Sequence, residues 1–218
     1  MTDRPFARLT RLFLLISALS IAQPAAAQLG SLPAEEWIKA LDAPARVTGL
    51  KVPEVIAALK IKAGQTIADI GAGSGVFSLP MGRAVRPGGT VFSVDINKEL
   101  LDHVETEATE QGMVNVKPVV GSPSDPLLAV DVDLAFLNET LHHIEDRAGY
   151  LATLALYLKP GGRIAIIDFR PDQSPHKDDP TMVVSEEQAT KWLEPAGLKA
   201  VEHINLYPDR WFVVYAKP

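Results

Sequence analysis

The sequence predicts an α/β fold in which a mainly parallel sheet is covered by helices on both faces. Short apolar segments alternate with amphipathic helical segments, which is the pattern of strands joined by crossover helices. The apolar segments are almost continuously apolar, as expected for strands buried on both faces of a sheet. The chain has 218 residues, 47% of them hydrophobic, enough for one domain with a substantial core.

The first 27 residues have the three-part pattern of a secretory signal peptide. Three arginines open the segment, residues 12–22 are mostly apolar, and the ending PAAA at 24–27 offers small residues for cleavage. We expect cleavage after Ala27 and export, into the periplasm of a bacterial cell. An uncleaved segment would tether the protein to the membrane, although its apolar run is short for a spanning helix. No run in the rest of the sequence is apolar and long enough to cross a membrane.

Residues 28–62 are expected to form an N-terminal helical extension ahead of the main domain, which covers residues 63–218. Residues 33–41 have the spacing of a short amphipathic helix. Residues 52–60 are predicted to form a second one, and Pro53 falls in its first turn, where a helix tolerates proline.

Short apolar segments of the main domain are predicted to be strands. In chain order they are residues 66–70, 90–94, 116–120, 133–137, 163–168, 199–206 and 211–216. Four residues join the last two segments, too few for a crossover helix, so this pair must be an antiparallel hairpin.

Helices are predicted between these strands. They cover residues 76–85, 97–111, 146–158 and 185–197. Pro80 should kink the first of them or delay its start, and Ser185 opens the last with a capping box. A turn at residues 159–162 separates the third helix from the fifth strand. The long segment 169–184, rich in Pro and Asp, is expected to be a lid or a binding loop.

A glycine-rich loop follows the first strand, where residues 69–75 read DIGAGSG. Ligands of an open α/β sheet bind beyond the carboxyl ends of its strands, and glycines let a ligand approach the main chain closely. The segment differs from the G-x-G-x-x-G pattern of dinucleotide binding because residue 76 is Val, and it lacks the Gly-Lys-Ser/Thr of a P-loop. Asp69 would repel a pyrophosphate and suits a cation.

Asp95 is a second signal, at the end of the second strand. It follows Gly75 by 20 residues, the place where an acidic residue can hold both hydroxyls of a ribose. The alternative is that Asp95 caps the next helix, but Asn97 is the better cap candidate.

These features together resemble the class I S-adenosylmethionine-dependent methyltransferases, over residues 52–218. The resemblance is carried by ADIGAGSG, VFSVDIN, the HHI segment at 142–144 and LKPGGRIAIIDF. It is nearest to an exported bacterial branch of small-molecule methyltransferases (type 11-like), related to the quinone-biosynthesis group. The resemblance implies a Rossmann-like seven-stranded sheet in the order 3-2-1-4-5-7-6, with strand 7 antiparallel and helices on both faces.

The resemblance also implies residues that hold the methionine end of S-adenosyl-L-methionine. Gly71 and Gly73 would underlie this part of the cofactor, and Gly75 belongs to the same loop. Asp69 would help to hold the ammonium group, and Asn138 would contact the methionine end through its backbone.

The ribose and the adenine have their own implied contacts. Asp95 would hold the ribose, and Ile96 would pack on the adenine. Where the family often has Gly-Asp-Ala after the third strand, residues 121–125 read GSPSD, and Pro123 has no N–H to offer. Asp125 is the substitute candidate for the adenine contact, and the alternative is a simple turn residue.

His142 is the candidate catalytic residue, because it follows the fourth strand, where the family faces the transferring methyl group. An imidazole can take up a proton near neutral pH. Alternatively, His142 or His143 packs at a helix start and does no chemistry. No metal site is expected, since adjacent residues on a helix point apart. His176, in the long loop, would line the substrate entrance or be solvated, and Trp37 is expected to serve in packing.

The function expected from these features is direct methyl transfer from S-adenosylmethionine to a small-molecule or quinone-like acceptor. The sulfonium is a good methyl donor, so the protein mainly has to align the reacting atoms. The net charge of −6 argues against nucleic acid as a partner, and the absence of cysteine excludes disulfides and thiolate metal sites.

Two alternatives remain open. One is a catalytically inactive, cofactor-binding module of the periplasm. The other is a nucleotide-dependent oxidoreductase, against which Asp69 and Val76 argue. The sequence leaves the acceptor atom and the oligomeric state undetermined.

Overall fold

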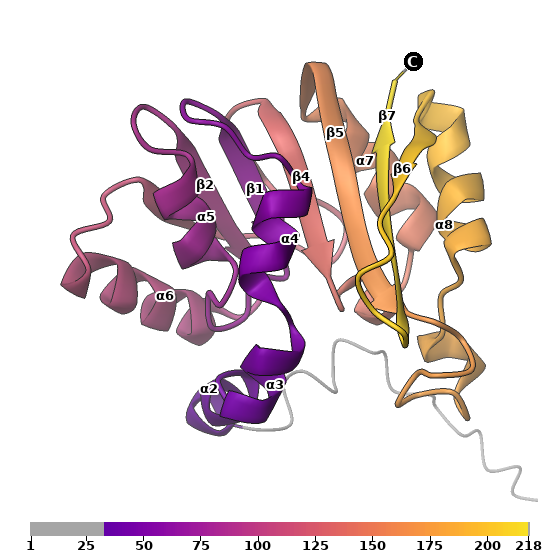
Figure 1. The fold of residues 1–218 in the computed structure, drawn as a ribbon, viewed down its shortest axis with the longest axis horizontal. Coiled ribbons are helices and arrows are strands. Elements are labelled where there is room, and N and C mark those ends of the chain that lie inside the picture. Colours follow the sequence, from indigo (N-terminus) through magenta and orange to yellow (C-terminus); the bar gives the residue numbers. More distant parts are fainter. Residues whose placement is uncertain (1–32, 218) are drawn as a thin grey trace, which may run out of the picture.

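The structure is a computed structural model that describes residues 33–217, with a seven-stranded sheet between two layers of helices (Figure 1). The strands are β1 (Thr66–Ile70), β2 (Thr90–Asp95), β3 (Val116–Val120), β4 (Val132–Asn138), β5 (Leu158–Phe169), β6 (Lys199–His203) and β7 (Arg210–Ala216). They lie in the order β3-β2-β1-β4-β5-β7-β6. The first five are parallel, and β7 runs antiparallel to both β5 and β6. The predicted strand order and the antiparallel hairpin are confirmed.

Except for the first two, which lie near the carboxyl ends of the parallel strands, the helices divide between the two faces of the sheet (Figure 1). They are α2 (Ala34–Leu41), α3 (Pro44–Gly49), α4 (Val52–Ala58), α5 (Ser78–Ala84), α6 (Lys98–Glu110), α7 (Arg147–Leu156) and α8 (Glu186–Leu193), with the 3-10 turns η1 (Leu141–His143), η2 (Pro180–Met182) and η3 (Glu194–Ala196). One core joins α4, α5 and α6 to the sheet through Val55, Met81 and Val104. The opposite core joins α7 and α8 through Leu151 and Leu193.

Local sequence signals determine where several helices begin. The side chain of Asn97 accepts hydrogen bonds from the backbone N–H groups of Glu99 and Leu100, so it caps α6 as predicted. Ser185 forms the predicted capping box of α8. Because α5 begins only at Ser78, Pro80 lies in its first turn, where it removes no helical hydrogen bond.

The boundaries around β5 differ from the prediction. Helix α7 ends at Leu156, and β5 begins at Leu158 instead of Arg163, so residues 159–162 belong to the strand. The strand pairing shifts register between Val132 and Leu134. A Cβ on Gly162 would lie 2.9 Å from the carbonyl oxygens of Lys159 and Val132. The glycines therefore permit a bulge within the strand. The turn predicted at residues 159–162, from the turn propensity of Pro and Gly, is wrong.

Two further boundaries were not predicted. The short helix α3 lies between the two expected helices of the extension, and β6 ends at His203 instead of Leu206. The predicted signal peptide, residues 1–27, lies outside the described residues. Within residues 33–217, the apolar stretches of the helices are too short to span a membrane.

The carboxyl ends of the parallel strands point toward the end of the molecule that carries α2 and α3 (Figure 1). The strand order reverses at β1, which pairs with β2 on one side and with β4 on the other. A crevice outside the carboxyl ends at such a reversal is the usual ligand position in an open α/β sheet.

Candidate functional site

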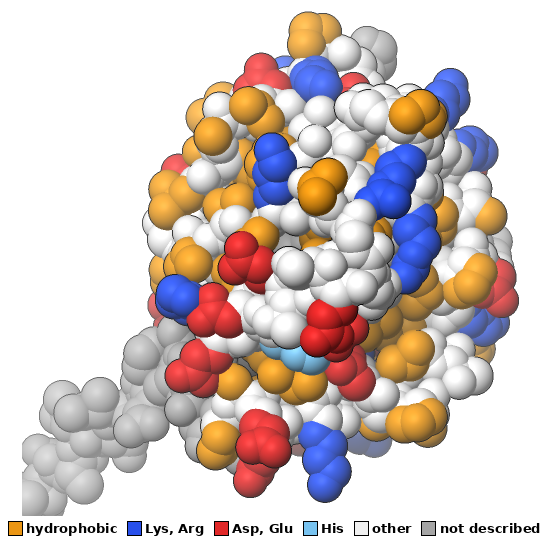
Figure 2. Space-filling view, turned by 90° about the vertical axis from the view of Figure 1, so that its left-hand side faces the viewer, with side chains coloured by type: hydrophobic (Ala, Val, Ile, Leu, Met, Phe, Trp, Pro, Cys, Tyr) orange, Lys and Arg blue, Asp and Glu red, His pale blue; other side chains and the backbone are white. Residues whose placement is uncertain are grey.

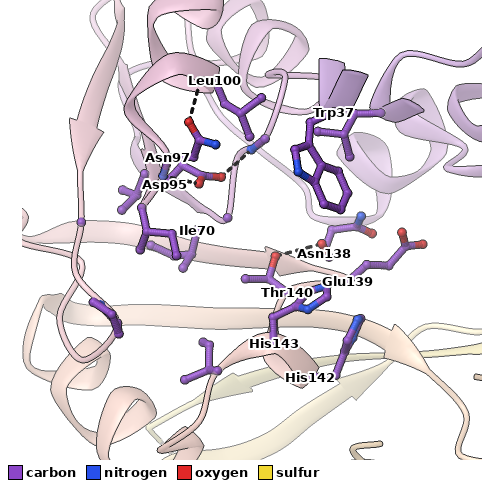
Figure 3. A pocket seen from close by; sticks show the side chains of 18 of the residues that line it. Trp37, Ile70, Asp95, Asn97, Leu100, Asn138, Glu139, Thr140, His142 and His143 are labelled. Atoms are coloured by element: carbon purple, nitrogen blue, oxygen red, sulfur yellow. Dashed lines mark hydrogen bonds between the residues drawn. The ribbon is translucent and has the colours of Figure 1, made fainter. Parts of the chain in front are cut away.

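A cavity of about 360 Å³ opens at this reversal point, between the strand ends and α2 (Figure 3). Its walls come from the glycine loop, the ends of β2 and β4, η1, α2 and the loop after β5. The predicted site residues that line it are Gly71, Gly73, Asp95, Ile96, Asn138 and His142. Asp95 and the histidines lie on opposite sides of the cavity, with Asn138 between them (Figure 3).

The glycines of the loop allow close packing of other segments. Gly71 has a φ of +71°, and a Cβ there would lie 2.4 Å from Thr140 side-chain atoms. Gly73 has a φ of +54°, and a Cβ would lie 3.0 Å from the Leu41 side chain of α2. Gly75 lies behind the cavity wall, where a Cβ would meet Val104 of α6.

Asp95 connects the end of β2 to the glycine loop. One carboxylate oxygen accepts from the backbone N–H of Gly73 at 2.9 Å, and the other accepts from that of Asn97 at 2.9 Å. Burial raises the pKa of Asp95, although these hydrogen bonds oppose the shift. Each carboxylate oxygen can accept a further hydrogen bond, so both hydroxyls of a ribose could be held here.

Asp69 lies beneath the loop, beside a smaller hollow of about 40 Å³ that Asn138 also lines. Its carboxylate accepts from the hydroxyl of Ser78 at 2.6 Å, and burial raises the pKa of Asp69 to about 7. The side-chain oxygen of Asn138 is buried and has no hydrogen-bond partner among the described residues. A buried acceptor without a partner and a buried carboxylate at the same hollow fit an ammonium group, which would supply the missing donor.

Asp125 is not among the residues that line the cavity. Its carboxylate accepts from the hydroxyl of Tyr157 at 2.8 Å and from the backbone N–H of Leu127 at 2.7 Å. These are the contacts of the turn residue that the sequence left as the alternative. Ser122 and Pro123 line the cavity instead.

His142 is fixed from several sides in η1. Its ring Nδ1 lies 2.7 Å from one carboxylate oxygen of Asp168, and its backbone N–H donates to the other at 3.2 Å. The guanidinium of Arg147 donates to its carbonyl oxygen at 2.7 Å. Asp168, at the end of β5, is 1% exposed. Such a carboxylate selects the tautomer in which the other ring nitrogen, Nε2, is free to accept a proton.

Three imidazole rings meet at this side of the cavity. The centroids of the His142 and His143 rings are 4.2 Å apart, and that of His176 lies 5.5 Å from the first and 6.2 Å from the second. The expectation that the adjacent histidines point apart is wrong, because η1 is a single 3-10 turn and both rings bend over the cavity (Figure 3). Burial lowers the pKa of His143 to about 3, and His142, His176 and Arg147 add to the shift.

No group of three or more His, Asp or Glu side chains within residues 33–217 is arranged to hold a metal ion. Of the two interpretations offered for His176, the structure favours the cavity wall, which this loop residue helps to form.

Other residues of the site were missed by sequence reasoning. Trp37 of α2 lines the cavity, and its indole N–H is buried without a partner among the described residues. Glu139, with a φ of +52°, binds Arg46 of α3 at 3.3 Å and Arg210 of β7 at 2.7 Å. Asp168 carried a usable signal, since it is a carboxylate at the end of an apolar strand.

A family profile described as a methyltransferase domain matches residues 61–205, more than half of the chain. The chain belongs to this methyltransferase domain family. The cofactor of the domain is S-adenosylmethionine, and Asp95 with the pair Asp69 and Asn138 provides acceptors that fit its ribose and its ammonium group.

Similarity to individual proteins points the same way. A ubiquinone biosynthesis O-methyltransferase of Caulobacter vibrioides is 33% identical over 100 residues, which cover 45% of this chain and 38% of that protein. The chain thus spans less than half the length of the curated relatives it matches.

Solved structures share the fold. A SAM-dependent methyltransferase from Aquifex aeolicus superposes with a TM-score of 0.75, at 23% identity, over 86% of this chain and 100% of the other. The magnesium protoporphyrin IX methyltransferase of Synechocystis PCC 6803 with bound SAM gives a TM-score of 0.62, at 17% identity, over 85% of this chain and 84% of the other. At these identities the likeness concerns the fold.

Proposed function

We propose that this chain transfers the methyl group of S-adenosylmethionine to a hydroxyl oxygen of a small, quinone-like aromatic molecule, with His142 as the general base. The observation that carries the proposal is the buried pair in which His142, in the wall of the cavity, is held by Asp168. The similarity to the Caulobacter protein, an O-methyltransferase of ubiquinone biosynthesis, supports the same acceptor class.

The cofactor side of the cavity would orient the methyl donor. The bound cofactor supplies an electrophilic methyl group on a sulfonium centre. Asp95 would accept hydrogen bonds from the ribose hydroxyls, and Asp69 with Asn138 would hold the ammonium group. These anchors lie across the cavity from the histidines (Figure 3), which leaves the space between them for the reacting groups.

The histidine side would activate the acceptor. As the oxygen attacks, its O–H bond breaks and the proton moves to Nε2 of His142. Asp168 accepts the hydrogen bond from Nδ1 and stabilises the imidazolium that forms. His143 stays neutral at physiological pH because burial lowers its pKa to about 3, so it adds no competing positive charge.

The cavity walls favour a flat and uncharged acceptor. The rings of His143, His176 and Phe169 and the indole of Trp37 offer surfaces for stacking, and the unpartnered indole N–H can donate to an acceptor oxygen. On the face shown in Figure 2, acidic side chains gather toward the lower end, where α2 lies in Figure 1, and Lys and Arg lie mainly above them. Acidic side chains on this face disfavour the approach of an anionic acceptor.

We also propose that the protein is exported, on the strength of residues 1–27 alone. Detection of the mature chain, beginning at Gln28, in the periplasmic fraction of an expressing bacterium would support export. Full-length chain in the cytoplasmic fraction would contradict it.

Binding and turnover are tested in sequence. Calorimetric titration with S-adenosylmethionine and its demethylated product should show binding, which Asp95→Ala weakens. Incubation with S-adenosylmethionine and a panel of catechols and quinols, followed by mass spectrometry, should give a methyl ether. Absence of binding by folded protein would contradict the proposal. Binding without turnover on any acceptor would favour the alternative of a cofactor-binding module.

A further inference from the structure

The side chain of His142 is almost completely buried, so a proton that it takes up is shielded from solvent. The residue is 4% exposed, its Nδ1 faces Asp168, and the ring centroids of His143 and Phe169 lie 4.2 and 6.1 Å from its own. A base that takes up one proton in every turnover has to release it before the next turnover. The enclosed ring therefore needs a route to solvent.

His176 stands where such a route would begin. It comes from the loop between β5 and α8, its ring centroid lies 5.5 Å from that of His142, and it is partly exposed. This spacing allows transfer directly or through one water molecule. His143 is the other neighbouring imidazole, but its low affinity for a proton makes it a poor carrier.

The loop holds His176 in place by its own hydrogen bonds. The backbone N–H of His176 donates to the hydroxyl of Ser174 at 3.0 Å, and its carbonyl accepts from the N–H of Asp179 at 2.8 Å. Ser174 is 6% exposed although the residues on both sides of it are exposed. The loop is also tied to η1, because Arg147 donates to the carbonyl oxygens of both His142 and Thr181.

We propose that His176 relays the proton from His142 to solvent, an inference that rests on the proposed function. The acceptor O–H bond breaks as the O–CH3 bond forms and the C–S bond of the sulfonium breaks. The proton passes to Nε2 of His142, then to a ring nitrogen of His176, and then to water. The balance is one hydroxyl and one sulfonium converted to one ether, one thioether and one proton in solvent.

Charged groups lie beside both rings of the relay. Asp168 of β5 pairs with Nδ1 of His142, and the charge of His176 adds to the lowered pKa of Asp179, whose hydrogen bonds to Thr181 are the main cause. Arg147 of α7 donates to the carbonyl oxygen of His142, and its positive charge helps to lower the pKa of His143.

The relay is tested first by exchange, without an acceptor. In protein labelled with ¹⁵N-histidine and saturated with the demethylated cofactor, NMR measures how fast a proton on Nε2 of His142 exchanges with water. His176→Gln should slow this exchange at least about tenfold, whereas the exposed and remote His203→Gln should leave it unchanged. Equal exchange rates in the wild type and in His176→Gln would overturn the relay.

The second test is turnover of a catechol at saturating S-adenosylmethionine. His176→Gln should lower kcat about tenfold or more without changing cofactor affinity, and added imidazole should restore the rate in proportion to its concentration. A full rate for this variant, or a loss that imidazole does not restore, would overturn the relay while the proposed function stands. A wild type that binds the cofactor and exchanges as expected, but never turns over, would overturn the proposed function instead.

Discussion

The two sides of the cavity are built in different ways. The cofactor side is made mostly of consecutive segments at the ends of β1 and β2, with the glycines, Asp69 and Asp95, and of Asn138 at the end of β4. The histidine side joins η1, the end of β5, the loop after it and α2, which are far apart in the chain. His142 and Asp168 are 26 residues apart, and His176 and Trp37 come from two further segments. The methyl donor is thus positioned mainly by residues that are close together in the sequence. The acceptor is activated by residues that only tertiary contacts bring together.

The largest effect is expected on kcat, from substitutions on the histidine side of the cavity. His142→Gln and Asp168→Asn should each lower kcat by about 10² to 10⁴, the usual contribution of a general base and its partner. The affinity for S-adenosylmethionine should stay within about twofold, since neither residue is an anchor of the cofactor. Calorimetry and single-turnover rates separate the two effects. Loss of cofactor binding in either variant would contradict the division of the cavity into two sides.

The opposite pattern is expected from the cofactor side. Asp95→Ala removes the carboxylate proposed to hold the ribose, and hydrogen bonds to a charged group contribute about 1.5–3 kcal/mol. The dissociation constant should therefore rise by about 10- to 100-fold. Asp102→Ala, which removes an exposed carboxylate that pairs with Lys98 on α6, is the matched control and should bind normally. An unchanged affinity in Asp95→Ala would remove Asp95 from the site.

The same contrast explains what the sequence could predict. The glycine loop, Asp95 and the cap at Asn97 are local patterns whose geometry follows from the backbone, and the alternation of strands and helices implied the sheet. Asp168 was not predicted as the partner of His142, because a side-chain contact between β5 and η1 has no local sequence pattern, although the strand order implied that β4 and β5 pair. The sequence predicts a packing role for Trp37, because an apolar helix face has the same sequence pattern whether it covers a core or a cavity. Residues 159–162 were misread because Pro and Gly favour turns locally, whereas strand pairing overrides that preference here.

Gly71 tests whether the two sides depend on each other. A Cβ at this position would lie 2.4 Å from atoms of Thr140, which precedes η1, and the positive φ adds strain. Gly71→Ala should lower the free energy of unfolding by about 2–4 kcal/mol. Gly161→Ala has a similar φ of +77° with no atom within 4 Å, so it measures the backbone strain alone. Equal losses of stability in denaturant titrations would show that the contact with Thr140 contributes nothing.

The smallest effect expected is a pH dependence confined to the cofactor side. Without a bound cation, burial raises the pKa of Asp69 to about 7, so this carboxyl is mostly protonated at pH 6. An ammonium group binds the carboxylate form, so the affinity for the demethylated cofactor should rise with pH, by at most about tenfold per pH unit below pH 7. The affinity for the demethylated cofactor should be measured between pH 5.5 and 7.5. At higher pH the α-amino group of the cofactor itself loses its proton, since free α-amino groups do so near pH 8. Asp69→Asn should reduce the dependence of the affinity on pH. Any dependence that remains in this variant is assigned to Asp95, whose pKa is also raised by burial. The same slope with and without Asp69 would mean that the ammonium group is held elsewhere.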